Sequence, residues 1–109
     1  MIIAIAGPYS AETAEDRMHN LNRLNEAAAR VLEMGHTPLI GVNAALPVLE
    51  MSTIEDPYES IMKISMAVIS ACEGLLLIGE SKGAIRERDW MIANGKPIYH
   101  TLDELKSLN

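Results

Sequence analysis

The sequence predicts a single α/β domain over residues 1–109, in which helices cover both faces of a parallel β-sheet. Apolar runs without polar alternation, at residues 2–6 and 75–78, are typical of strands buried on both faces. These runs alternate along the chain with segments of helical periodicity, which favours right-handed β-α-β crossovers. We therefore expect a three-layer, flavodoxin-like α/β/α fold with strand order 2-1-3-4, with or without a short fifth strand.

The first expected strand, residues 2–6, ends at a turn formed by Gly7, Pro8, Tyr9 and Ser10. Helical periodicity follows and stops at Gly35, where a left-handed C-cap is expected. The apolar residues that recur along this helix, and that we expect on its buried face, are Met18, Leu21, Leu24, Ala28 and Leu32.

Residues 37–42 are apolar and interrupted by Pro38, which suits the start of a second strand parallel to the first. Residues 43–53 are ambiguous. Their apolar side chains fit either a short helix or a mobile flap around Pro47. Both interpretations stay open from the sequence.

The next helix has a strong start, with Asp56 as N-cap, Pro57 at the first helical position and Glu59 three residues after the cap. Its expected buried stripe consists of Ile61, Ile64, Val68 and Cys72. The remaining expected elements are a third strand at residues 75–78, a helix over about residues 83–94 that Gly95 closes, a fourth strand at residues 97–99 and a polar terminal helix.

Composition limits the classes of partner. The net charge of −6 argues against a nucleic-acid polymer, because polymer binding usually requires a basic stripe. The single cysteine, Cys72, excludes an internal disulfide and lacks the companions of a zinc site. No segment resembles a signal peptide or a membrane span. We expect a cytoplasmic protein with no membrane partner, no metal and no organic cofactor.

The most informative segment is LLLIGESKGAIRE, residues 75–87. It joins a buried strand to a helix through Ser81, Lys82 and Gly83, at the sheet edge where open α/β folds bind ligands. Glu87 lies one helical turn beyond Gly83 and would meet a ligand resting on that bare backbone. A carboxylate that the helix N-terminus keeps ionised can act as a nucleophile at an acetal-like carbon.

A simpler interpretation of the same residues stands beside this one. Glu87 would be a solvated charge that complements the helix dipole, Gly7 and Gly83 plain turn residues, and Ser81 an N-cap. The turn after the first strand matches neither the Walker pattern nor GxGxxG, so a triphosphate or dinucleotide site is disfavoured. Arg17 is best explained as part of a charged surface, with reach to a phosphate as the alternative, and Trp90 as core.

Four segments together resemble one superfamily: AGPYS after the first strand, EMGHTP after the first long helix, ACEGLLLIGESKGAIRE, and ANGKPI before the last strand. In this combination and spacing the chain resembles the nucleoside 2-deoxyribosyltransferase superfamily over nearly its whole length. The likeness is strongest to short members grouped as DUF4406, relatives of the 2′-deoxynucleoside 5′-phosphate N-hydrolases.

The resemblance implies cleavage of the N-glycosidic bond of a nucleoside or nucleoside 5′-monophosphate. Glu87 matches the nucleophile, and Ser81 and Gly83 match the loop that binds sugar or 5′-phosphate. The turn with Gly7, Pro8, Tyr9 and Ser10 matches the loop that lines the substrate site, and we count Tyr9 with Glu87 as catalytic. Relatives of this kind form homodimers or larger homo-oligomers, which suits a chain of this size.

One position departs from the family pattern. Counting back eight residues from Glu73 places Ser65 where the family usually carries an aspartate that assists the departing base or positions the sugar. Asp56 and Glu59 lie roughly 13 and 9 Å from that position along a helix, so neither replaces it. Ser65 is therefore a substrate-site candidate, and a catalytically weak or inactive nucleotide-binding or regulatory domain is the alternative function.

Overall fold

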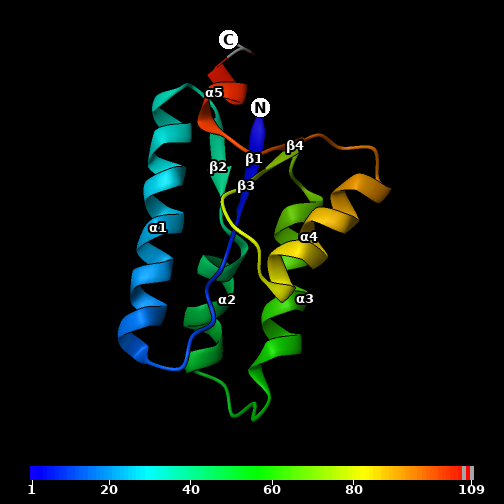
Figure 1. Cartoon of the computed structure of the whole chain (residues 1–109). Coiled ribbons are helices and arrows are strands. Elements are labelled where there is room, and N and C mark those ends of the chain that lie inside the picture. Colours follow the sequence, from blue (N-terminus) through cyan, green and yellow to red (C-terminus); the bar gives the residue numbers. More distant parts are fainter. Residues whose placement is uncertain (107, 109) are drawn as a thin grey trace.

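The computed structural model describes residues 1–106 and 108 and contains a four-stranded sheet with five helices (Figure 1). The elements in chain order are β1 (Ile2–Ala6), α1 (Ala14–Glu33), β2 (Thr37–Leu39), α2 (Gly41–Glu50), α3 (Pro57–Ser70), β3 (Gly74–Leu77), α4 (Lys82–Ala93), β4 (Ile98–Tyr99) and α5 (Leu102–Lys106).

All strand pairs are parallel and the order is β2-β1-β3-β4, which confirms the expected flavodoxin-like topology. The central pair aligns Ile3 with Gly74 and Ala6 with Leu77. The described residues contain no fifth strand. Chain connections diverge from β1 and β3 to opposite sides of the sheet, so the carboxyl ends of these neighbours form the topological switch point.

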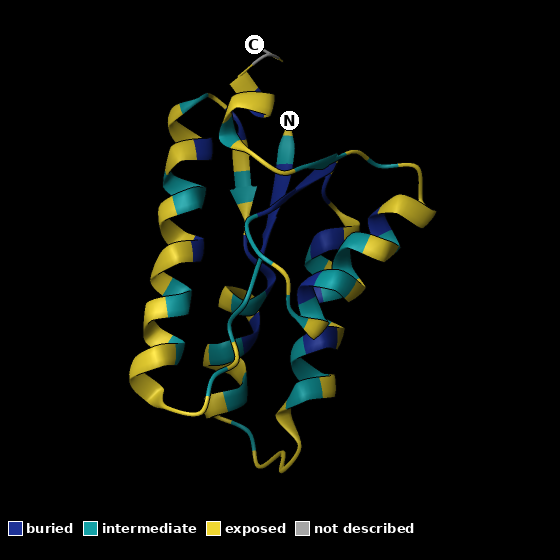
Figure 2. Cartoon of the chain, in the orientation of Figure 1, coloured by how far each residue is buried: buried dark blue, intermediate teal, exposed yellow. Residues whose placement is uncertain are grey.

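Helices cover both faces of the sheet, with α1 on one side and α3 and α4 on the other (Figure 1). Each face has its own apolar cluster, centred on Leu24, Val31 and Leu76 under α1, and on Ile69, Leu75 and Met91 under α3 and α4. Figure 2 shows the buried residues concentrated in the central strands β1 and β3 and on the inward sides of these helices. Burying one large aliphatic side chain contributes about 1.5–3 kcal/mol, so these clusters hold the three layers together.

The expected helix ends are largely confirmed. Asp56 and Ser81 are N-caps as predicted, and Thr13, which was not predicted, caps α1; all three side chains accept hydrogen bonds from backbone amides. Gly35 and Gly95 end α1 and α4 with φ of 92° and 72°, a left-handed conformation that glycine adopts without strain.

Most of residues 43–53, which fitted either a helix or a flap, are helical in the structure. Residues 41–50 form α2 with Pro47 inside it, and the expected second strand over residues 37–42 is shorter because Gly41 already begins this helix. In Figure 1, α2 lies beyond the carboxyl ends of the strands, between α1 and α3. Of the two interpretations, the helix is thus observed for residues 43–50, while residues 51–53 lie outside it.

Two predicted helix faces were also wrong in part. Met18 and Leu32 are 57% and 62% exposed, because α1 packs through the stripe that contains Leu24 and Val31. On α3 the deepest residues are Met62, Ser65 and Ile69, whereas Ile61, Ile64 and Val68 are only half-buried. The deep face of α3 therefore includes a serine, which hydrophobic periodicity alone does not find.

Candidate active site

A cavity of about 130 Å³ opens at the carboxyl ends of β1 and β3, the switch point of the sheet. The loops after β1 and β3, the start of α2 and one face of α3 surround it. Its lining is mainly apolar and consists of Ile5, Ala6, Gly7, Tyr9, Ser10, Leu24, Ile40, Gly41, Val42, Tyr58, Ile61, Met62, Ser65, Ser81, Lys82, Gly83, Ala84 and Glu87. We call it the site cavity.

The loop after β1 supplies three of the four residues expected from it. Gly7, Tyr9 and Ser10 line the site cavity, whereas Pro8 does not and instead packs its ring toward Gly79. A Cβ atom on Gly7 would lie 2.6 Å from Ile78 Cγ1, so only glycine allows this loop to leave β1 so close to the chain after β3. Pro8 therefore supports the neighbouring loop rather than the cavity wall.

The loop after β3 leads directly into α4. The Ser81 hydroxyl accepts a hydrogen bond from the Ala84 amide at 3.1 Å and caps the helix, as the simpler interpretation held, and Ser81 also lines the site cavity. A Cβ atom on Gly83 would lie 3.2 Å from Met62 Sδ, which shows how closely α4 approaches α3 here. One turn later, α4 brings Glu87 to the same cavity.

Glu87 is the only carboxylate among the residues that line the site cavity. Its Oε1 atom accepts a hydrogen bond of 3.0 Å from Ser65 Oγ. Burial raises the pKa of Glu87 to about 7, and the Ser65 hydrogen bond opposes this rise without cancelling it. Glu87 lies beyond the first turn of α4, where the helix dipole acts most strongly, so burial has the larger effect on its pKa.

Ser65 lies on α3 and is only 2% exposed. The first residue of α2, Gly41, covers it, and a Cβ atom on Gly41 would lie 2.7 Å from Ser65 Cα. Ser65 was identified from the sequence only as the site of a missing aspartate. The structure brings it into direct contact with Glu87.

Sequence reasoning missed the α3 side chains Tyr58, Ile61 and Met62, and it treated Lys82 only as part of a turn. The Lys82 ammonium lies over the Tyr58 ring, 4.9 Å from its centroid. Counting back from Ser65 by three and seven residues reaches Met62 and Tyr58, so helical spacing would have revealed this wall once Ser65 was placed in the site.

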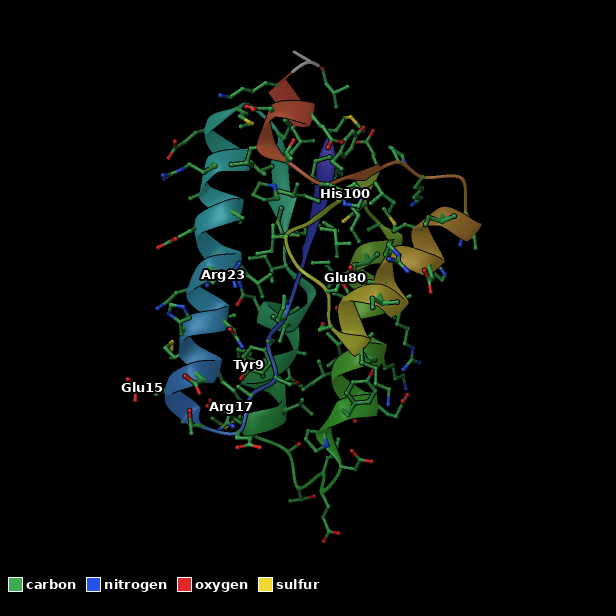
Figure 3. All side chains as sticks on the ribbon, viewed as in Figure 1. Tyr9, Glu15, Arg17, Arg23, Glu80 and His100 are labelled. Carbon is green, nitrogen blue, oxygen red and sulfur yellow. The ribbon has the colours of Figure 1, made fainter. Side chains whose placement is uncertain are left out.

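An outer groove of about 800 Å³ adjoins the site cavity and shares Tyr9, Ser10 and Ile61 with it. Its remaining walls come from the first half of α1, from α2 and from Pro57. Arg17 lines this groove rather than the site cavity, and its guanidinium donates to the Ala11 carbonyl oxygen at 2.8 Å. Figure 3 shows Tyr9 and Arg17 together at this end of the molecule, with His100 at the opposite end.

Trp90 does not line either space. It packs against the apolar cluster under α3 and α4, in agreement with its interpretation as core. Among residues 1–106 and 108, no three metal-ligating side chains gather in one place. In the same part of the chain, no helix combines the length and the hydropathy needed to cross a membrane.

No protein-family model matches the chain, and no curated protein matches it in sequence. A solved structure does match: a 2-deoxyribosyltransferase from the psychrotolerant bacterium Bacillus psychrosaccharolyticus, with a TM-score of 0.66 and 22% sequence identity. The match covers 90% of this chain and 69% of the other. The chain thus has the fold of a 2-deoxyribosyltransferase, while at this identity the likeness concerns the fold alone.

Proposed function

We propose that the protein cleaves the N-glycosidic bond of a nucleoside or nucleoside 5′-monophosphate, as a member of the nucleoside 2-deoxyribosyltransferase superfamily. The observation that carries the proposal is a lone half-buried carboxylate, Glu87, in a mainly apolar cavity at the switch point. The shared fold with a 2-deoxyribosyltransferase and the four sequence segments described above support the same reaction class.

The proposed reaction has two displacement steps at the anomeric carbon. The Glu87 carboxylate attacks C1′, the C1′–N bond breaks, and its electron pair leaves with the base, which takes a proton from solvent. The resulting glycosyl ester is then attacked at C1′ by water or by a second base, which loses a proton and releases the carboxylate. Water gives hydrolysis and a base gives transfer.

The dimensions of the site support a binding mode in which the sugar and the base of the substrate occupy two separate spaces. A cavity of about 130 Å³ is close to the size that holds one benzene ring. We infer that the sugar ring occupies the site cavity against Glu87, while the base extends past Tyr9 and Ile61 into the outer groove. In this arrangement Tyr9 contacts both halves of the substrate.

The proposal predicts a specific pH dependence. Only ionised Glu87 is a nucleophile, and burial holds its pKa at about 7. Therefore kcat/KM rises with pH, about tenfold per pH unit below 7, and levels off above it. A profile that is flat between pH 5 and 8 would contradict a nucleophilic role for Glu87.

The decisive test is release of free base from deoxynucleosides, ribonucleosides and their 5′-monophosphates, followed by chromatography with and without an acceptor base. Glu87→Gln should lower the rate at least about a thousandfold, because the amide is not a nucleophile. Glu80→Gln is the matched control, since Glu80 is exposed in the loop that leads into α4 and does not line the cavity. Equal rates for wild type and Glu87→Gln would refute the mechanism.

A nucleotide-binding or regulatory domain is the second candidate. It is favoured by the absence of any other carboxylate among the residues lining the site cavity, which leaves no second carboxyl group to assist the departing base. If no substrate in the panel releases base yet calorimetry detects nucleoside binding, this second function replaces the first.

We also propose that the protein acts as a homodimer or larger homo-oligomer. Val48, Met51 and Ile54, in α2 and the segment after it, are 57%, 87% and 53% exposed, and such apolar groups favour contact with another chain. Sedimentation equilibrium should give a mass of at least twice that of one chain.

A further inference from the structure

Resting on the proposed function, we propose that Ser65 is a positioning residue: its hydroxyl fixes Glu87 Oε1 and leaves Oε2 as the attacking oxygen, in a packing arrangement that only glycine at position 41 permits. The geometry behind this is the Ser65–Glu87 hydrogen bond of 3.0 Å, between neighbouring helices α3 and α4.

The hydrogen bond of Ser65 differs from that of Ser70, in the same helix. Serine hydroxyls inside helices often donate to a carbonyl oxygen in the preceding turn. Ser70, in the same helix, does this with the Ala67 carbonyl at 2.7 Å. Ser65 donates instead to Glu87, so its hydroxyl serves the cavity rather than its own helix.

The packing around Ser65 restricts where its hydroxyl can turn. Ser65 is 2% exposed, so water does not compete for the hydroxyl. Gly41 lies so close that a Cβ atom there would overlap Ser65 Oγ and lie 2.7 Å from its Cβ. A branched or longer side chain at position 65 would meet the same backbone, which gives a physical reason why serine rather than aspartate occupies this position.

Among the ionisable side chains that line the cavity, none is a hydrogen-bond partner of Glu87 in place of Ser65. The remaining ionisable residues that line the cavity are Tyr9, Tyr58 and Lys82, and the Lys82 ammonium lies over the Tyr58 ring. Burial and the Ser65 hydrogen bond are accordingly the two influences on the pKa of Glu87. Loss of the hydroxyl therefore acts on Glu87 specifically.

The first arm of the test compares Ser65→Ala and Ser65→Cys with wild type in the base-release assay. A hydrogen bond to a charged group is worth about ten- to a hundredfold, so Ser65→Ala should lower kcat by that factor with KM changed less than twofold. Ser65→Cys should lie between the two, since a thiol is a weaker donor. Ser70→Ala, a serine in the same helix outside the cavity, should match wild type.

The second arm measures Glu87 without catalysis. A carbon-13 NMR titration of its carboxyl carbon should give a higher pKa in Ser65→Ala than in wild type and no change in Ser70→Ala. Gly41→Ala, which pushes on Ser65 without removing it, should shift the Glu87 titration in the same direction.

The outcomes separate the two proposals. An unchanged kcat or an unchanged Glu87 titration in Ser65→Ala overturns the role of Ser65. Absence of base release by wild type overturns the proposed function and, with it, catalytic positioning, while the titration still decides whether Ser65 holds Glu87.

Discussion

Charged side chains at the two ends of the sheet differ in their hydrogen-bond partners. At the amino end, where the strands begin, charged side chains bond to backbone groups that the elements leave unpaired. At the carboxyl end, around the site cavity, the half-buried carboxylate of Glu87 accepts a hydrogen bond from one hydroxyl, that of Ser65. Charged side chains at the amino end thus stabilise the fold, whereas the carboxylate at the carboxyl end has few hydrogen-bond partners.

Glu73 and Lys96 illustrate the amino end. Glu73 Oε2 accepts from the Ile2 amide at 2.6 Å, at the start of β1. Lys96 Nζ donates to the Ser70 and Cys72 carbonyl oxygens at 3.0 and 2.6 Å and lies over the Trp90 ring. A cation at these carbonyls complements the carboxyl end of α3.

Each end also has one buried polar atom without a hydrogen-bond partner. The His36 Nε2 atom is buried without a hydrogen-bond partner at the amino end, although Nδ1 lies 3.1 Å from the Met1 amino group. The Tyr58 hydroxyl is buried at the cavity, beside the Arg86 guanidinium but without hydrogen-bond geometry. The contrast therefore concerns charge: a buried ionised carboxylate with few partners is destabilising, and a substrate can exploit it.

Glu87→Gln should give the largest change in stability, and in the direction opposite to its effect on activity. The folded pKa of about 7 exceeds the ordinary value of 4.5, so folded Glu87 binds a proton more tightly than the unfolded chain does. The free energy of unfolding of wild type consequently falls as pH rises from about 4.5 to 7, by roughly 3 kcal/mol at most. Glutamine carries no charge, so the variant should be more stable at pH 8 and within about 1 kcal/mol of wild type at pH 5.

Urea unfolding at both pH values measures this difference. A stability gap that is the same at pH 5 and pH 8 would show that Glu87 is not responsible, and a less stable variant at pH 8 would show that the carboxylate is well satisfied.

Lys96→Met should have the next largest effect, and it should destabilise. The variant loses two charge-assisted hydrogen bonds and a cation–π contact; because one bond is exposed and the other only part-buried, water partly replaces them and the total loss should be about 1–2 kcal/mol. Lys63→Met is the matched control, because Lys63 is an exposed lysine on α3. The thermal unfolding midpoints of the two variants should differ by several degrees. Equal midpoints would show that Lys96 does not stabilise the amino end of the sheet.

Glu73→Ala should have the smallest effect, about 0.5–1 kcal/mol, because its bond to the Ile2 amide is exposed and water replaces the lost acceptor. Glu73→Gln keeps an acceptor oxygen and should stay closer to wild type in the same urea measurement. A loss larger than that of Lys96→Met would reverse the ranking within the amino end.

Local patterns in the sequence were sufficient for most of the fold. The apolar runs, the caps at Asp56 and Ser81 and the glycines at 35 and 95 predicted the elements, and their alternation predicted the strand order. These signals are short-range, because caps and turns depend on neighbouring residues. Ambiguity arose at Pro47, since proline usually ends a helix, whereas here α2 continues around Pro47 and packs against α3.

The site was predictable in part. Spacing placed Gly83 and Glu87 on one helix face, and parallel topology placed the loops after β1 and β3 at one edge; both inferences agree with the cavity lining. Pro8 does not line the cavity, because adjacency in a loop does not fix which way a residue faces.

By itself, then, the sequence determined which residues form strands and helices and at which edge a site would lie, because those properties follow from local periodicity and from chain connectivity. Tertiary structure alone decided that Ser65 meets Glu87, that Gly41 closes over Ser65, and that burial raises the pKa of Glu87 to about 7. Residues 41, 65 and 87 are far apart in the chain. Contact and desolvation between them exist only once α2, α3 and α4 have packed together.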